Sequence, residues 1–324
     1  MASIDEQCPK LATIQDERIL IFGGSGSLGK STIARWIHTN TIVNVSRDEE
    51  KQWLLKTAIN HPNLSQHIGD ITNVDDVTHA ILTIKPTLIC IFACLKHIDL
   101  CEKFPGKSMS NNTQGIINVE TVLMRHKTNV KTVLFVSTDK ACLPITTYGC
   151  SKALAEFFLQ QVVSEQTKWV GVRYGNVLNS SGSILPYLHA HKHTPAPYSL
   201  THPDMTRFIM TLDQSINLIE YAIVNGKHNE LIIPKLHSMR IQELFSIFEA
   251  KYGKPHKITG LRCKEKIHED LISESEAKLT YVKGAYYHIN DKIPISDEVA
   301  PFDSSDFLIS QEEMESYLAS KNLL

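Results

Sequence analysis

The sequence lacks a CxxC pair, a block of like charge and any long apolar run. Its seven cysteines are an odd number, and several lie inside apolar segments, where a reduced thiol packs as a small hydrophobe. A disulfide framework or a zinc knuckle is therefore not expected. No apolar run approaches the roughly 20 residues of a membrane-spanning helix, and residues 1–18 are polar, without a signal-peptide core. We expect a soluble protein of the cytoplasm, a reducing compartment, with no membrane partner.

The charge balance excludes partners that need a strongly basic surface. Lysine and arginine number 33 against 35 acidic residues, and no basic cluster is visible, so nucleic acid is not expected as a partner. With 42% hydrophobic residues, the 324-residue chain can bury a large core. His189, His191 and His193 alternate but have no acidic or thiol partner nearby in sequence, so no metal is expected. A small-molecule partner is the best starting hypothesis.

Short apolar runs alternate with helical patterns through the first half of the chain. Near-continuous Val, Ile and Leu in such runs is typical of parallel strands that are covered on both faces. We therefore predict an α/β fold, a Rossmann-type doubly wound parallel sheet with a smaller C-terminal substrate lobe. The predicted strands are 18–22, 42–45, 87–92, 132–136 and 168–172, and helices are expected to begin near Ser27, Asn73, Asn111 and Thr147.

The alternation breaks down beyond Asn176. Residues 179–206 have the Pro, His, Ser and Thr content of loops. A strand is expected over 231–234 and a helix over 242–252, whereas the tail after Lys278 looks irregular. These pieces indicate a second lobe placed over the carboxyl edge of the sheet.

The domain boundary is expected at the end of the alternating region. Residues 1–177 would form the Rossmann domain, with a returning segment near 205–233, and residues 178–324 would form mainly the substrate-binding lobe.

A glycine-rich loop, Gly23 to Ser31, follows the first predicted strand and allows two interpretations. From Gly23 it spells GxxGxxG, a relative of the dinucleotide fingerprint, in which glycines let the backbone approach a pyrophosphate at a helix N-terminus. From Gly24 it spells GxxxxGKS, the P-loop of ATP- and GTP-using proteins. The two interpretations predict different functions, and the loop alone does not decide between them.

The end of the second predicted strand favours a cofactor with a 2′-phosphate. Ser46 and Arg47 follow the strand directly, and Lys51 lies one helical turn beyond. In a dinucleotide-binding fold this position lies beside the adenosine ribose, where an acidic residue suits a 2′-hydroxyl, whereas Arg and Ser suit a 2′-phosphate. We therefore expect NADP rather than NAD, although the acidic residues 48–50 also fit a solvated helix start. Asp70 would face the adenine, or it caps the next helix.

Two polar segments carry the expected chemistry. STDK, residues 137–140, follows the predicted strand 132–136 directly, at the strand end where ligands bind in open α/β sheets. Tyr148 and Lys152 come next, and their spacing places them on one helix face. A lysine ammonium beside a phenol lowers the pKa of the phenol from about 10 towards neutrality. A phenolate can then take a proton from a sugar hydroxyl as hydride leaves the same carbon. The P-loop interpretation explains neither segment, so we prefer the dinucleotide interpretation.

Together the motifs resemble those of the extended short-chain dehydrogenase/reductase superfamily, and most those of the inverting UDP-N-acetylglucosamine 4,6-dehydratases. Large relatives with a membrane anchor, and some soluble ones, have Met at the tyrosine position, so Tyr148 indicates the short soluble form. The matching segments are GGSGSLGK (23–30), SRDEEKQ (46–52), GDI (69–71), LKH (95–97), STDKA (137–141), YGCSK (148–152), RYGNV (173–177), MTRF (205–208) and EKIHE (265–269).

The chain also departs from that family pattern at several positions. SSGS (180–183) lacks an arginine that is usual there, and RCKEKIHE (262–269) differs from the usual RPGEKxHE. Cys94 stands where alanine is usual, and Leu143 and Thr146 stand where asparagines are usual. These differences concern contacts to the substrate, not the central chemistry.

The resemblance implies a reaction without net oxidation. Tyr148 would remove the O4 proton of the sugar while NADP⁺ takes hydride from C4, and the new ketone acidifies H5. Lys140 would abstract H5 in its neutral form, which requires its pKa to fall from about 10.4 through burial and the nearby Lys152 cation. Asp139 would protonate O6 as it leaves in water, and Thr138 would bond a sugar hydroxyl or simply end its strand. Relatives that retain configuration commonly have glutamate at the Lys140 position, so inversion at C5 is expected.

The same resemblance implies the binding residues and the assembly. The helix of Tyr148 often pairs with its own copy in this superfamily, so a homo-oligomer is expected. The expected cofactor-binding residues are Gly23, Ser25, Gly26, Ser27, Leu28, Gly29, Ser46, Arg47, Lys51, Asp70, Ile71, Ala93, Lys96, Asn112, Tyr148, Lys152 and Val177. The expected contacts to UDP-GlcNAc or a related UDP-hexose are Lys96, His97, Thr138, Asn176, Arg207, Arg262 and Glu265, with the two arginines on phosphates or in surface ion pairs.

Other functions stay open at this point. A retaining UDP-sugar 4,6-dehydratase or a UDP-hexose 4-epimerase would use the same tyrosine. A P-loop phosphotransferase would use Lys30 and Ser31, with Asp139 on magnesium. A non-catalytic NADP sensor usually loses the tyrosine, so Tyr148 and Lys152 argue against it.

Overall fold

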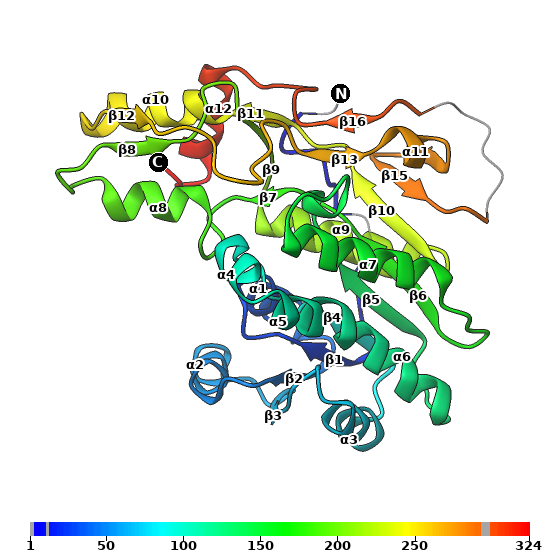
Figure 1. Cartoon of the computed structure of the whole chain (residues 1–324). Coiled ribbons are helices and arrows are strands. Elements are labelled where there is room, and N and C mark those ends of the chain that lie inside the picture. The colour runs from blue at the N-terminus through cyan, green and yellow to red at the C-terminus, as the bar shows by residue number, and fades with distance from the viewer. Residues whose placement is uncertain (1–2, 11–12, 293–298) are drawn as a thin grey trace.

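The computed structural model describes residues 3–10, 13–292 and 299–324, and a nine-stranded sheet forms the larger of its two lobes (Figure 1). The strand order is β14-β15-β10-β6-β5-β4-β1-β2-β3, parallel from β10 to β3, with β14 and β15 as an antiparallel edge. The order β3-β2-β1-β4-β5-β6 is that of the doubly wound Rossmann sheet, so the predicted fold class is confirmed. The strands are β1 (Arg18–Phe22), β2 (Thr41–Ser46), β3 (Leu64–Ile68), β4 (Leu88–Ile91), β5 (Thr132–Val136), β6 (Lys168–Val172), β10 (Glu230–Pro234), β14 (Thr280–Lys283) and β15 (Tyr286–Ile289).

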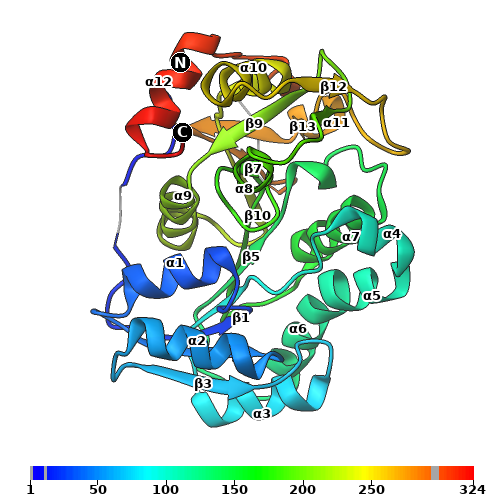
Figure 2. The same ribbon diagram turned by 90° about the vertical axis from the view of Figure 1, so that its left-hand side faces the viewer.

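Helices cover both faces of this sheet (Figure 2). Successive side chains of a strand point to opposite faces. In β1, Ile19 and Ile21 pack in the core under α1 (Ser27–Trp36) and α9 (Leu212–Asn225), and Leu20 and Phe22 pack in the core under the other helix layer. This double burial explains why the strands are apolar at consecutive positions. The other layer consists of α3 (Val74–Ile84), α6 (Gly115–Arg125) and α7 (Thr147–Gln161), while α2 (Glu49–Ile59) lies beside β2 and β3.

A helix with a π-helical turn leads into α6. It begins at Pro105, because proline lacks an N–H and suits the first helical position. The expected start near Asn111 was therefore too late. α5 (Pro105–Met109) continues through the π turn Ser110–Gln114 into α6, and α4 (Ile98–Lys103) precedes it. Such turns are frequent at functional sites, and this one carries Asn112.

The smaller lobe is assembled from short elements over the carboxyl edge of the sheet (Figure 1). Its core contains Leu185, Tyr198, Phe245, Phe248 and Leu318. Its elements are β7 (Asn176–Val177), β9 (Thr206–Met210) and β11 (Ser238–Arg240) in one sheet, β8 (Tyr198–Leu200) paired with β12 (His256–Ile258), β13 (Asp270–Ile272) paired with β16 (Phe302–Asp303), and α8 (Ile184–His191), α10 (Ile241–Tyr252), α11 (Glu274–Ala277) and α12 (Gln311–Ser320).

The tail after Lys278 is not irregular, so that prediction was wrong for the β14–β15 hairpin. The hairpin turns at Gly284, whose φ of +62° suits glycine. Tyr286 stacks on Tyr221 of α9 with ring centroids 4.0 Å apart, and Tyr286 is fully buried. The aromatic side chains of the hairpin therefore pack it against the edge of the large sheet.

Among the described helices, none is both long and apolar enough to span a bilayer.

Candidate active site

The glycine loop joins β1 to α1 in a conformation that requires glycine. Gly23 has a φ of +90°, and a Cβ there would lie 2.6 Å from the nitrogen of Ala93. A Cβ on Gly29 would lie 2.4 Å from the Cα of Gly24, so this glycine lets the helix pack on the loop. α1 begins at Ser27, which places Lys30 inside the first helical turn. The loop therefore has the glycine roles and helix start of a dinucleotide-binding turn.

A groove of about 630 Å³ runs from this loop along the ends of β2 and β3. At its far end Arg47 Nη1 lies 3.3 Å from Asp70 Oδ2, and Ser25 Oγ donates to Ser46 Oγ over 3.3 Å. Lys51 pairs with Asp48 over 2.6 Å. Expected cofactor residues that line the groove are Gly23, Ser25, Gly26, Ser27, Ser46, Arg47, Lys51, Asp70, Ile71, Ala93 and Lys96.

A second hollow of about 430 Å³ shares Gly23, Gly26, Ser27 and Lys96 with this groove. It also contains Leu28, Gly29, Tyr148, Lys152 and Val177, which completes the expected cofactor set except Asn112. A channel that is lined by the glycine loop and ends at the phenol of Tyr148 and the amine of Lys152 fits a nicotinamide dinucleotide.

Asn112 holds in place the segment after β4 that forms part of the wall of this channel. Its side-chain oxygen accepts from the backbone N–H of Leu95 at 2.8 Å, and its nitrogen donates to the carbonyl of Leu95 at 3.0 Å. The same nitrogen donates to Ser151 Oγ of α7 at 3.0 Å. The π turn thus fixes the segment after β4, from which Lys96 reaches across to donate to the carbonyl of Ser181 at 2.7 Å.

Close backbone packing brings the two polar motifs together. A Cβ on Gly149 would lie 2.1 Å from the carbonyl oxygen of Lys140, so only glycine lets the 3₁₀ turn Asp139–Ala141 rest on the start of α7. Thr146 caps α7 by accepting from the N–H of Gly149 at 3.0 Å. The STDK and YGCSK segments therefore form one unit at the carboxyl end of β5.

Tyr148 lies at the centre of this unit and is 8% exposed. Burial raises the pKa of its phenol well above 10, while a hydrogen bond with the Thr138 side chain acts in the opposite direction. Burial lowers the pKa of Lys152 to about 8. Its ammonium nitrogen donates to the carbonyl of Val136 at 2.5 Å and lies 4.0 Å from the centre of the Phe135 ring. The expected fall in the pKa of Tyr148 is thus not found, because burial outweighs the Thr138 hydrogen bond and the neighbouring Asp139 also raises the pKa.

A buried cluster of charge lies next to Tyr148. Lys140 Nζ is 3.1 Å from Asp139 Oδ1 and 3.1 Å from Glu269 Oε1. Thr138 Oγ1 also donates to Asp139 Oδ1 at 2.9 Å. Burial opposes the charge on Lys140, but the two carboxylates outweigh burial, so the pKa of Lys140 is raised. The expected fall in the pKa of Lys140 was therefore wrong.

A cavity of about 720 Å³ lies beyond this cluster, between α4 and the segment before β13. Its wall contains Lys140, Asn176, Arg207, Arg262 and Glu265. A smaller hollow, lined by Lys96, His97, Thr138, Asp139, Lys140, Tyr148 and Asn176, connects the large cavity to the cofactor channel. All the expected substrate residues therefore line one or both of these spaces.

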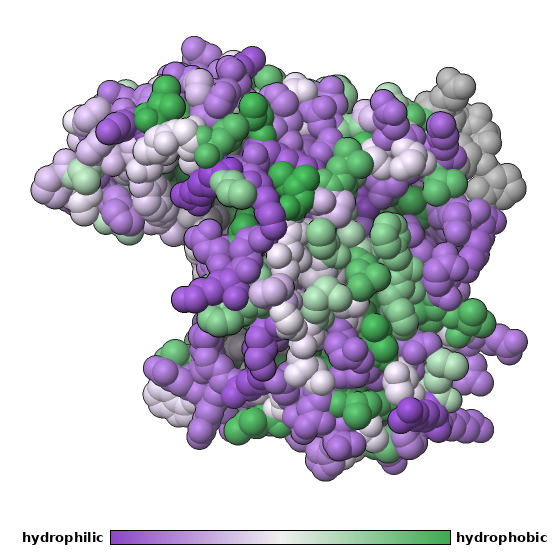
Figure 3. All heavy atoms as spheres, in the orientation of Figure 1, coloured by the Kyte–Doolittle hydropathy of each residue, from purple (hydrophilic) through white to green (hydrophobic). Residues whose placement is uncertain are grey.

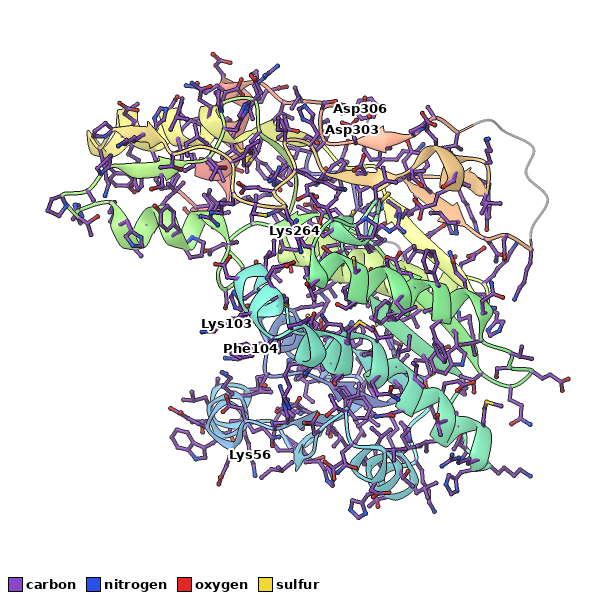
Figure 4. All side chains as sticks on the ribbon, in the orientation of Figure 1. Lys56, Lys103, Phe104, Lys264, Asp303 and Asp306 are labelled. Atoms are coloured by element: carbon purple, nitrogen blue, oxygen red, sulfur yellow. The ribbon has the colours of Figure 1, made fainter. Side chains whose placement is uncertain are left out.

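The outer edge of the cavity is polar. Figure 3 shows the recess between the lobes edged mainly by hydrophilic side chains. Lys264 comes from the smaller lobe and lies near α4, the helix that carries Lys103 (Figure 4). Lys264 Nζ is 2.7 Å from Glu102 Oε2 of that helix, so an ion pair joins the two lobes across the cavity.

Three expected substrate residues differ in how free their polar groups are. Arg207 donates to the carbonyls of Thr206, Ile267 and Lys266 at 2.6, 3.0 and 3.0 Å, so its guanidinium is already used inside the protein. The carboxylate of Glu265 accepts from the backbone N–H of Arg262 at 3.1 Å. Asn176 has a buried side-chain oxygen without a hydrogen-bond partner among the described residues.

Sequence reasoning did not select Glu269, although it stands in the EKIHE segment. It is 4% exposed and contacts Lys140. The sequence signal for Glu269 was the acidic end of that segment, but no neighbouring residue indicated which charged side chain Glu269 would contact.

Within the described residues, no group of three or more His, Cys, Asp or Glu is placed to hold a metal ion.

The fold and the site define a Rossmann-type sugar-nucleotide enzyme architecture, and comparison with known proteins gives the family. A model of the polysaccharide biosynthesis protein family matches residues 19–291. The chain is 32% identical, over 85% of its length and 83% of the relative, to a protein of Rickettsia typhi named UDP-glucose 4-epimerase. The protein belongs to the polysaccharide biosynthesis protein family, within the extended short-chain dehydrogenases/reductases, which include sugar-nucleotide epimerases and dehydratases.

Solved structures agree with this assignment. Pen from Bacillus thuringiensis superposes with a TM-score of 0.87 at 27% identity, covering 96% of this chain and 99% of Pen. WbmG from Bordetella bronchiseptica, solved with NAD and UDP, superposes with a TM-score of 0.63 at 21% identity, covering 78% of this chain and 84% of WbmG. At that identity the second similarity shows the fold alone.

Proposed function

We propose that this protein is an NADP-dependent UDP-N-acetylglucosamine 4,6-dehydratase that inverts C5 and forms a UDP-4-keto-6-deoxy-L-hexosamine. One observation carries the proposal: Lys140 Nζ lies 3.1 Å from Asp139 Oδ1 in the hollow that also contains Tyr148. A 4-epimerase needs a base and hydride transfer at C4 only. An acid and a base beside the tyrosine are what loss of water from C5 and C6 requires.

In the proposed mechanism, hydride transfer belongs to the cofactor channel, and the proton transfers belong to residues beside the sugar cavity. The dinucleotide, in the glycine channel, would supply the hydride acceptor for C4 and the hydride donor for C6. Tyr148 takes the O4 proton, with Thr138 bonded to its phenol. Lys140 removes H5, and Asp139 donates the proton with which O6 leaves as water. Asp139 Oδ2 is buried and has no hydrogen-bond partner among the described residues, so no protein contact competes for the proton that it would donate.

The preference for NADP rests on the end of β2. Arg47 follows β2 directly, the position that lies beside the adenosine ribose in dinucleotide-binding folds, and its side chain is 55% exposed, so it can turn to a 2′-phosphate. Asp70 holds Arg47 at the groove. WbmG was solved with NAD, so NAD is the alternative to test.

We further propose the lobe assignment, the assembly and the compartment. The Rossmann domain, residues 1–177 with a returning segment near 205–233, would bind the cofactor. Residues 178–324 would bind mainly the substrate, while β10, β14 and β15 of this range complete the large sheet. On α7, Leu154 and Phe157 are 44% and 63% exposed, which suits pairing with the same helix of a second copy. The free cysteines suit the reducing cytoplasm.

The test is incubation of the purified protein with UDP-GlcNAc in deuterated water, followed by NMR of the product. The proposal expects a C6 methyl group, deuterium at C5 and the inverted C5 configuration. A C4 epimer with an intact C6 hydroxyl would instead identify a 4-epimerase, the activity named for the Rickettsia relative. Deuterium at C5 with retained configuration would identify a retaining dehydratase.

A further inference from the structure

The mechanism above does not use Glu269, a buried carboxylate that touches the reactive lysine. Its side chain is 5% exposed, and its Oε1 lies 3.1 Å from Lys140 Nζ and 3.8 Å from Arg207 Nε. Its second oxygen, Oε2, is buried without a hydrogen-bond partner among the described residues. An unpartnered buried carboxylate oxygen is costly, so this one requires an explanation beyond packing.

The backbone holds Glu269 in place independently of its side chain. Its N–H donates to Ser304 Oγ at 2.8 Å, and its carbonyl accepts from the N–H of Ser304 at 2.8 Å. Ser304 Oγ in turn bonds Thr206 Oγ1 of β9 at 2.7 Å. Arg207, the next residue of β9, donates to the carbonyls of residues 266 and 267. The segment is therefore fixed on both sides, and the carboxylate is presented to Lys140 by a rigid frame.

We propose that Glu269 is a positioning residue for the dehydration: it holds the amine of Lys140 at the sugar cavity and takes a proton from it, which leaves Lys140 free to remove H5. The inference rests on the proposed dehydratase function. In this step the Nζ–H bond breaks, an Oε1–H bond forms, and the bonding pair stays on Nζ. That pair then takes H5 as a proton, and the electrons of the C5–H bond expel O6 with the proton from Asp139. C5 takes a proton from water on the opposite face, and Tyr148 releases the O4 proton to water. Glu269 passes its proton through Lys140 to Asp139, since both carboxylates lie 3.1 Å from Lys140 Nζ, and this restores the starting charges.

The charges around Lys140 make the effect of Glu269 measurable. Asp139 and Glu269 raise the pKa of the amine, while burial and Arg207 lower it. Replacement of Glu269 by glutamine removes one negative charge and leaves Arg207 in place, so the pKa of Lys140 must fall. The charged and titratable groups that line the two spaces around Lys140 are Lys96, His97, Asp99, Glu102, Lys103, Asp139, Tyr148, Arg207, Arg262, Cys263, Lys264, Glu265, Lys266 and Glu269.

The experiment compares Glu269→Gln with Glu265→Gln in the full-length, NADP-loaded protein. The rate of H5 exchange from UDP-GlcNAc into deuterated water is measured as a function of pH. Glu265 lines the same cavity, but its carboxylate contacts the backbone N–H of Arg262 instead of Lys140. We expect the pH limb that requires neutral Lys140 to move down by about one pH unit or more in Glu269→Gln, with a lower plateau rate, and to stay in place in Glu265→Gln.

Glu269→Asp separates the charge from the reach of the side chain. It should return the pH limb to its wild-type position at a reduced plateau rate. An unmoved limb in Glu269→Gln, or a limb that moves equally in Glu265→Gln, overturns the inference. Loss of all exchange in both Glu269 variants, with NADP still bound, also overturns it, because the carboxylate would then serve substrate binding. Absence of the 6-deoxy product with the wild-type protein is a different result, since it refutes the proposed function itself.

Discussion

The cofactor channel and the sugar cavity meet at Tyr148 but are built in different ways. Around the glycine loop, the channel consists of backbone and small residues at the ends of the neighbouring strands β1 and β4, as at Gly23 and Ala93. The cavity depends on charged side chains from distant segments, as in the pairing of Lys140 with Glu269. A binding surface made of backbone follows from local sequence, whereas one made of ion pairs depends on tertiary contacts. The two regions should therefore respond differently to substitution.

The largest effect is expected where the regions meet. Tyr148→Phe removes the only acid–base group proposed for O4, while the ring keeps its buried packing. Turnover of UDP-GlcNAc should fall by about 10³-fold or more, since positioned proton transfer contributes about 10²–10⁴-fold. NADP binding, measured by fluorescence titration, should weaken by no more than about tenfold, because loss of one hydroxyl contact costs about 0.5–1.5 kcal/mol. Wild-type turnover in this variant would assign the O4 proton to another group.

The next effect should separate the cavity from the channel. Lys140→Met keeps the length of the side chain but removes the base, so H5 exchange should fall by about 10²–10³-fold. Hydride uptake from C4 uses Tyr148, so a reduced-nicotinamide absorbance should still appear when UDP-GlcNAc is added. Exchange of H5 at the wild-type rate would remove Lys140 from the mechanism.

A third effect concerns the frame behind the site. Arg173 is buried, and its guanidinium lies 2.5 Å from Glu156 of α7 and 2.6 Å from Glu276 of α11. Arg173→Met would leave two carboxylates without their cation, and we expect the free energy of unfolding to fall by about 3 kcal/mol or more. Urea unfolding of the NADP-free protein measures this change. A Glu120→Gln variant, from a half-buried carboxylate of α6, is the control and should change it by less than about 1 kcal/mol.

The same ion pair predicts an acid dependence of stability. Burial alone would raise the pKa of Glu276, but Arg173 lowers it from 4.5 to about 2. A carboxyl whose folded pKa is lowered stabilises the fold above its unfolded pKa, and that contribution is lost as pH falls towards the folded value. Wild-type stability should therefore decline between about pH 4.5 and pH 2, and Arg173→Met should lose part of that decline. Equal acid profiles would contradict the assigned ion pair.

The cofactor channel and the sugar cavity also differ in how well the sequence predicts them. Gly23 and the STDK and YGCSK segments were predictable because each acts within a short stretch, and their contact follows from one strand end and one helix start. Glu269 was not, since its carboxylate meets Lys140 only through the pairing of β13 with β16 and the Arg207 contacts. The pKa of Lys140 was misjudged for the same reason. The β14–β15 hairpin was missed because its few residues gain their order from Tyr221 on a distant helix.

The smallest effect should lie at the far end of the channel, in the choice of cofactor. Arg47 is held at the groove by Asp70, and replacement by alanine removes the guanidinium proposed for the 2′-phosphate. The dissociation constant for NADP should rise about tenfold, which corresponds to about 1.4 kcal/mol, close to the lower end of the range for a charge-assisted bond. Affinity for NAD should be unchanged. Lys56→Ala is a matched control, because Lys56 lies on α2 but outside the described lining of the groove (Figure 4). Equal losses for both cofactors in Arg47→Ala would mean that Arg47 shapes the groove without reading the phosphate.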